Sequence, residues 1–180
     1  MPSSIFESRR VADLSSGAQF AIWCLRARAC SIQTGEPPYR RLGRGFDLAG
    51  IQPAMRHFET LFEWLARGAS QGVRIGCLKC SHVTADEGIV LAALAAYQRA
   101  DTTSGEILLG VFLPRPACLN ASVAAHRLAA AMQGADLGVA VAPAGADRPQ
   151  ARAHAQAQVQ AQAASWPAAS PGVPESKLVH

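Results

Sequence analysis

Aromatic residues, charged residues and lysine are all scarce in this chain, and the low charge argues against a disordered protein. Aromatic residues make up 6% and charged residues 17% of the 180 residues, whereas a wholly disordered chain is typically rich in charge. The only lysines are Lys79 and Lys177, so 15 of the 17 basic residues are arginine. Five cysteines are too few for a small disulfide-stapled module. Alanine is abundant, at 36 residues, and because it is the best helix former, the composition favours helices.

Long hydrophobic runs are missing as well. The longest, 89–97 and 107–113, fall well short of the roughly 20 apolar residues that a transmembrane helix needs. The first residues include the charged Glu7 and Arg9 and no apolar stretch typical of a signal peptide. We therefore expect no membrane association and a cytoplasmic location, where thiols are kept reduced.

Helical periodicity predicts an all-α fold, a compact bundle of five or six helices. The segment 84–99 is apolar on almost every side, which is typical of the central helix of a bundle. Thr84 followed by two acidic residues marks its start, because a hydroxyl cap and early acids both stabilise a helix N-terminus. Residues 36–50 are expected to form a connector with one short helix. Other helices are expected over 16–33, 52–69, 104–113 and 118–133.

The apolar stripe of the 52–69 helix is expected to pack against the central helix. The residues expected to be buried together are Phe58, Leu61, Phe62, Leu65, Leu91 and Leu94.

Composition also predicts the domain organisation. Residues 1–15 are interpreted as an N-terminal extension, 16–142 as a single helical domain and 143–180 as a low-complexity tail. The tail has few apolar side chains to bury except Val159 and Trp166, so we expect it to be disordered and dispensable for folding.

The strongest chemical signal is Cys77-x-x-Cys80, followed two residues later by His82. Two cysteines at this spacing can bind one zinc ion from a tight turn, but a complete site needs four ligands. The histidine would be a third ligand, and a fourth, Cys30 or Cys118, would have to come from another helix.

Three interpretations of this motif stay open at this stage. The cysteines are buried structural residues, or they bind a metal (zinc before an iron–sulfur cluster), or they form a thiol–disulfide pair. Cys80 is the predicted functional thiol, with Cys77 or Cys30 assisting it. Lys79 and the helix that begins near Thr84 are both expected to stabilise its thiolate.

The same region resembles a known pattern. The stretch 73–98 contains R-I-G-x-x-x-C-x-x-V-T-A-D-E and then an alanine- and leucine-rich helix ending in Y-Q. It is similar to a family of small, alanine-rich, uncharacterised bacterial helical proteins, over residues 16–133. The resemblance implies that Cys80 matters more than Cys77, with Cys30 as its candidate partner.

Positive charge is concentrated near the N-terminus. Residues 1–60 carry most of the net charge of +4, as eight basic and five acidic side chains. A basic face of this kind is a candidate contact for nucleic-acid phosphates, and its alternative is an ordinary solvated face. The arginines of this face are Arg26, Arg28, Arg40, Arg41 and Arg44.

These features predict a small cytoplasmic accessory or regulatory protein that acts through contacts with a protein partner. Its cysteine motif is the candidate metal-binding or redox-sensing site. The alternative is a nucleic-acid-binding regulator that uses the basic face. A thiol-dependent enzyme is a second alternative, less favoured because no matched catalytic base is evident in the sequence.

Overall fold

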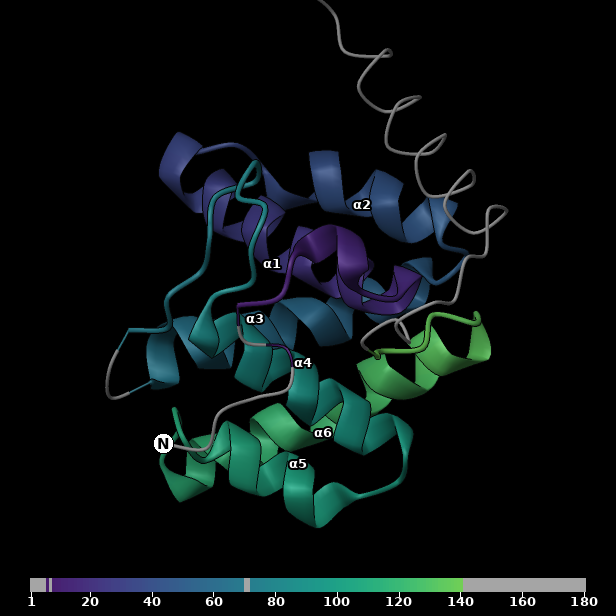
Figure 1. The fold of residues 1–180 in the computed structure, drawn as a ribbon. Coiled ribbons are helices and arrows are strands. Elements are labelled where there is room, and N and C mark those ends of the chain that lie inside the picture. Colours follow the sequence, from purple (N-terminus) through teal and green to yellow (C-terminus); the bar gives the residue numbers. More distant parts are fainter. Residues whose placement is uncertain (1–5, 7, 70–71, 141–180) are drawn as a thin grey trace, which may run out of the picture. The chain divides into compact units, whose positions relative to one another are not determined.

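The structure is a computed structural model that describes residues 6, 8–69 and 72–140. These residues form six α-helices and two short 3₁₀ helices (Figure 1). No strand occurs in these ranges, which contain one isolated bridge between Arg10 and His82. The predicted all-α fold is confirmed. The helices are η1 (Val11–Asp13), α1 (Ser16–Thr34), α2 (Pro38–Leu48), η2 (Gln52–Ala54), α3 (Met55–Gly68), α4 (Ala85–Gln98), α5 (Thr102–Leu109) and α6 (Arg115–Gly134).

Helices α1 and α4 both begin at hydroxyl caps, and the cap at Thr84 was predicted. The Ser15 side chain accepts a hydrogen bond from the Ala18 amide at the start of α1. At the start of α4, Thr84 and Glu87 form a capping box, in which each side chain accepts from the backbone N–H of the other. These caps satisfy amide groups that would otherwise lack a partner at the helix ends.

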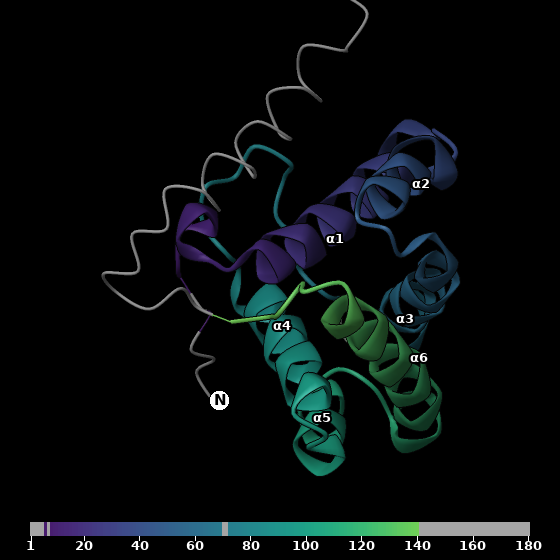
Figure 2. The same ribbon diagram turned by 90° about the vertical axis from the view of Figure 1, so that its right-hand side faces the viewer.

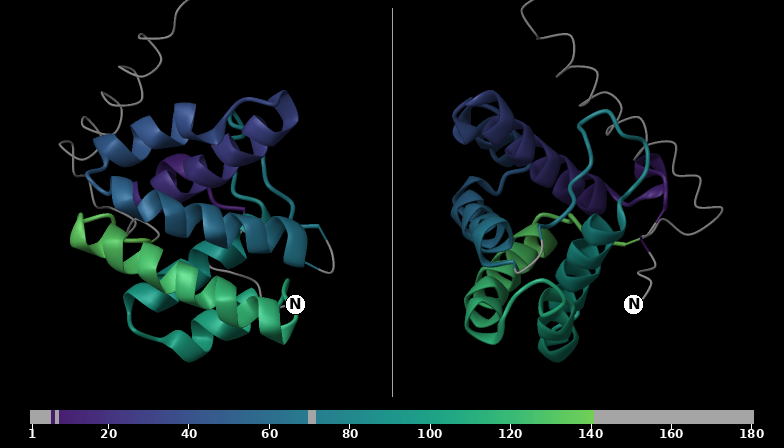
Figure 3. Two further views of the ribbon diagram at one scale, coloured as in Figure 1. Left: turned by 180° about the vertical axis from the view of Figure 1, so that it is seen from behind. Right: turned by 90° about the vertical axis from the view of Figure 1, so that its left-hand side faces the viewer.

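Helix α4 is the central helix, as predicted, because it is buried on nearly every side. It packs against α1, α5 and α6, while α6 lies alongside α3 and α1 lies alongside α2 (Figures 2 and 3). The six core residues predicted on α3 and α4 are all buried in one hydrophobic cluster. That part of the packing prediction is confirmed.

The connector predicted over 36–50 contains more helix than expected. Helix α2 spans eleven of its residues and buries Leu42, Gly45 and Phe46. Gly45 is needed there because a Cβ atom at this position would lie about 2.4 Å from the Trp23 ring of α1.

Two of the described residues before α1 pack against the helices. Phe6 and Leu14 are buried in the core. The chain divides after Ala144, and every described residue lies in the first unit, Met1–Ala144. The tail predicted over 143–180 lies outside the described residues. Among those described, no helix is both long and apolar enough to span a membrane.

Candidate thiol–disulfide site

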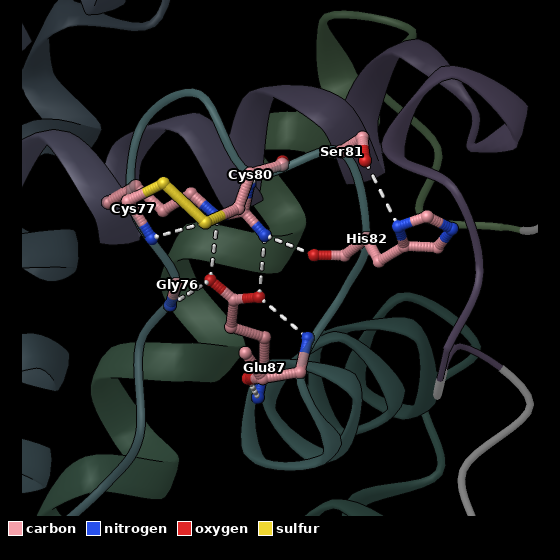
Figure 4. Close-up of a disulfide and its surroundings, with 8 residues drawn as sticks. Gly76, Cys77, Cys80, Ser81, His82 and Glu87 are labelled. Atoms are coloured by element: carbon pink, nitrogen blue, oxygen red, sulfur yellow. Dashed lines mark hydrogen bonds and ion pairs between the residues drawn. A yellow bond between two sulfur atoms is a disulfide. The ribbon is translucent and has the colours of Figure 1, made fainter.

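Cys77 and Cys80 form a disulfide in the exposed loop that precedes α4 (Figure 4). Their Cα atoms are 5.2 Å apart, within the usual range for bonded cysteines. The Cys80 amide donates to the Cys77 carbonyl at 3.1 Å, which closes a tight turn. The Cys77 amide donates to Sγ of Cys80 at 3.2 Å. Both cysteines are exposed to solvent, so the bond is accessible to thiols.

Beneath this loop lies a buried ion pair between Arg26 of α1 and Glu87 of α4. Arg26 Nε donates to Glu87 Oε1 at 2.8 Å, and Arg26 Nη2 donates to Oε2 at 2.9 Å. The two side chains are only 3% and 0% exposed. This fork-like geometry is the strong form of an arginine–carboxylate interaction.

Each member of the pair also binds the backbone of the cysteine loop. Arg26 Nη1 donates to the Cys80 carbonyl at 2.5 Å, and its Nη2 donates to the His82 carbonyl at 2.7 Å. The Gly76 amide donates to Glu87 Oε1 at 2.9 Å. The loop is therefore held on both sides of the disulfide by one buried pair of charges.

Gly76 lets the loop approach this pair closely. A Cβ atom at position 76 would lie about 3.0 Å from Nη2 of Arg26 and about 3.2 Å from Cζ. Such contacts are tighter than side chains normally make, so any other residue here would displace the guanidinium or the loop.

The surroundings of Glu87 keep its carboxylate charged. Burial alone would raise the pKa of Glu87, but the hydrogen bonds from Arg26, Thr84 and Gly76 outweigh burial and lower the pKa below its ordinary value. A carboxylate that accepts this many hydrogen bonds strongly favours its charged form.

This placement adds a second negative group to the sequence interpretation of the start of α4. The start of α4 was expected to stabilise a Cys80 thiolate. Glu87 sits in the first turn of α4 and binds the Thr84 amide, so the negative charge at that helix end belongs to Glu87. The group that contacts the Cys80 sulfur is the Cys77 amide.

Of the residues predicted to bind a metal, Cys77 and Cys80 are bonded to each other, whereas His82 and Cys30 do not join them. The Nδ1 atom of His82 lies 3.0 Å from the Ser81 hydroxyl, and the ring points away from the disulfide (Figure 4). Cys30, about one turn after Arg26 in α1, is a free thiol that Arg41 contacts at 3.8 Å, and Cys80 is bonded to Cys77 instead of to Cys30, the partner that the family resemblance implied. No three His, Cys, Asp or Glu residues gather into a metal site within the described ranges. In the disulfide form, Cys77 and Cys80 have no thiolates to offer zinc or an iron–sulfur cluster.

Cys24 and Cys118 are buried free thiols. Burial, with a smaller contribution from Glu59, raises the pKa of Cys24 well above its ordinary value, which makes this thiol a poor nucleophile. It lies in the hydrophobic core.

The five arginines of the predicted basic face are not one surface. Arg26 is buried against Glu87, Arg28 binds Glu59 at 2.8 Å and Arg41 binds Glu36 at 2.9 Å. Arg40 and Arg44 are exposed on α2. Since three of the five lie beside carboxylates, the charge available for phosphate is much smaller than the sequence indicates.

The pairing of Arg26 with Glu87 was missed because the two residues are 61 positions apart in the chain. The sequence does indicate where Glu87 lies. Thr84-x-x-Glu87 matches a capping box, which predicts that the Glu87 side chain turns back toward the loop. Nothing in the sequence identifies Arg26 as the partner.

No protein-family model matches the chain, and no curated protein or solved structure matches it. What the chain does is therefore inferred from the geometry of this site.

Proposed function

We propose that this chain is a small helical redox-responsive protein whose working group is the Cys77–Cys80 pair, which interconverts between disulfide and dithiol. The observation that carries the proposal is an exposed disulfide in a loop held by the buried Arg26–Glu87 pair. An accessible disulfide on a rigid support can exchange with thiols in solution while the fold around it is retained.

The reaction is ordinary thiol–disulfide exchange. The thiolate of an incoming thiol attacks Sγ of Cys77, a new S–S bond forms, and the Cys77–Cys80 bond breaks. The electron pair of the broken bond goes to Sγ of Cys80, where the Cys77 amide stabilises the new charge. A second thiol releases the first as a small disulfide, so two electrons and two protons have been transferred to the protein.

This order of events makes Cys80 the leaving group on reduction and the attacking thiolate on reoxidation. It agrees with the prediction that Cys80 is the functional thiol, and it assigns the assisting role to Cys77. Within a reducing compartment such as the cytoplasm, disulfides are usually transient and act in catalysis or redox sensing. A role as an accessory or regulatory protein that reports redox state to a protein partner follows from this chemistry.

The test is the reduction potential of the full chain, measured by equilibration in glutathione buffers with alkylation and mass spectrometry. The oxidised chain should present three free thiols after denaturation and the reduced chain five. A potential between about −180 and −300 mV supports exchange with cellular thiols, and a potential below about −300 mV identifies a structural disulfide and overturns the proposal.

Matched variants identify the working pair. Cys80→Ser should abolish the two-thiol difference between oxidised and reduced chains. Cys118→Ser should leave that difference unchanged, because Cys118 is a buried free thiol.

A further inference from the structure

We propose that the redox state of the Cys77–Cys80 pair controls how firmly the N-terminal segment, residues 8–14, docks on the helical body. This inference rests on the proposed function, since it names what the thiol–disulfide change regulates. It goes beyond that function by assigning the conformational response to a particular part of the chain.

The N-terminal segment binds the three residues that directly follow Cys80. The Val11 amide donates to the Ser81 carbonyl at 2.8 Å, and the Val83 amide donates to the Arg9 carbonyl at 2.9 Å. Between these bonds, Arg10 and His82 pair as an antiparallel bridge. The surface on which the segment docks is therefore continuous with the disulfide loop.

Docking also buries apolar side chains on either side of the bridge. Leu14 is 3% exposed, and Phe6, just before the segment, is 1% exposed. Beyond Leu14 the chain enters α1 through the Ser15 cap. The segment is thus held by two backbone hydrogen bonds near the disulfide and by apolar burial at its ends. Weakening the hydrogen bonds would shift the segment toward a state in which Phe6 and Leu14 are exposed.

The disulfide contributes to docking because it restricts Cys80, the neighbour of Ser81. With the bond intact, the loop from Cys77 to Ser81 is closed into a tight turn and presents the Ser81 carbonyl in one position. Without it, the loop keeps its hydrogen bonds, including those from Arg26, but Cys80 loses its covalent restraint. A preorganised acceptor loses less entropy on binding, so the disulfide form should dock the segment more firmly.

Such coupling is reciprocal. If the disulfide strengthens docking by some factor, docking must stabilise the disulfide against reduction by the same factor. Weakening the segment's hydrogen bonds should therefore make the disulfide easier to reduce, and this can be measured without knowing the partner.

Val11→Pro is the sharpest probe. Proline has no amide hydrogen, so this variant removes the bond to Ser81. The residue before it, Arg10, already has an extended backbone, with φ −71° and ψ 137°, which a following proline favours. Position 11 is the first residue of η1, where proline is tolerated. Val11→Ala is the matched control, because it also removes the valine side chain but keeps the amide.

We expect Val11→Pro to shift the equilibrium with glutathione at least threefold toward the dithiol, and Val11→Ala to shift it less. Threefold corresponds to a potential about 14 mV less negative, at about 30 mV for each tenfold change. Equal equilibrium constants for wild type, Val11→Pro and Val11→Ala would overturn the coupling.

Amide hydrogen exchange tests the coupling in the unsubstituted chain. The Val11 and Val83 amides should exchange at least threefold faster in the dithiol form, while the amide of the buried core residue Leu91 keeps its rate. Unchanged exchange at both amides overturns this inference. A potential in the exchange range combined with unchanged amides would leave the proposed function standing, whereas a potential below about −300 mV would remove that function whatever the amides do.

Discussion

At the scale of single residues, the Arg26–Glu87 pair is what gives the cysteine loop its position. The Glu87 carboxylate accepts four hydrogen bonds, two from Arg26 and one each from the Gly76 and Thr84 amides. Burying two charges is costly, and hydrogen bonds to every side of both groups offset that cost. Removing one partner leaves the other charge buried and unpaired.

Glu87→Gln is therefore predicted to lower the free energy of unfolding by about 3–5 kcal/mol, the usual loss when a buried pair is broken. Glu63→Gln, on the exposed face of α3, should change it by less than about 0.5 kcal/mol. Urea unfolding of the oxidised chains measures both. Similar small losses for the two variants would contradict the central role of the pair.

The same carboxylate predicts a pH dependence. The pKa of Glu87 is lowered in the folded protein from its ordinary value of 4.5, so the unfolded chain binds its proton more readily. The resulting stability is fully present above pH 4.5 and is lost as the pH falls through the lower folded pKa. Urea unfolding between pH 7 and pH 3 should show this loss, and in Glu87→Gln the acid side of the curve should be flatter. Parallel curves for the two proteins would count against the assignment.

The sequence predicted the cysteines of this site but not their support. Spacing within a short segment identifies Cys77 and Cys80, because both lie in one turn. Arg26 appeared to be a surface arginine, since its burial depends on a carboxylate that α4 supplies. Contacts across distant helices leave little trace in a single sequence.

At the scale of helices, α4 and the elements around it follow from local pattern. An uninterrupted apolar helix with a capping box must be buried on several sides, and α4 is. The cap at Thr84 was predicted to the residue because its hydrogen bonds are local. The extent of α2 was not, because its glycines disfavour a helix and the burial of Leu42 and Phe46 depends on contacts with other helices.

Leu91→Ala tests the packing of α4. Leu91 is 0% exposed, so the variant should lower the free energy of unfolding by about 2–5 kcal/mol through lost burial and a cavity. Leu48→Ala is the matched control, because Leu48 in α2 is 60% exposed and its loss should cost less than about 1 kcal/mol. Thermal or urea unfolding compares the two. A Leu91→Ala loss below about 0.5 kcal/mol would contradict the packing.

At the scale of the whole helical unit, contacts between its two ends complete the structure. The Ser15 hydroxyl donates to the Gly138 carbonyl at 2.6 Å and accepts from the Ala140 amide at 2.9 Å. Gln98, at the end of α4, donates to the Leu137 carbonyl and accepts from the Val139 amide. Residues 137–140 thus join the start of α1 to the end of the central helix, which no sequence pattern indicated.

Two shortened chains test this closure. A chain ending at Ala142 keeps all of these contacts and should melt within a few degrees of the full chain. A chain ending at Gly134 loses the buried Val139 side chain, worth about 1.5–3 kcal/mol, and leaves the polar groups of Ser15 and Gln98 without these partners. Its free energy of unfolding should fall by about 3 kcal/mol, which lowers the melting temperature by roughly 10 °C for a unit of this size. Calorimetry measures the melting temperature of both shortened chains. A large decrease for the chain ending at Ala142 would show that the residues beyond it stabilise the helical unit. An unchanged melting temperature for the chain ending at Gly134 would show that the closing contacts add nothing to stability.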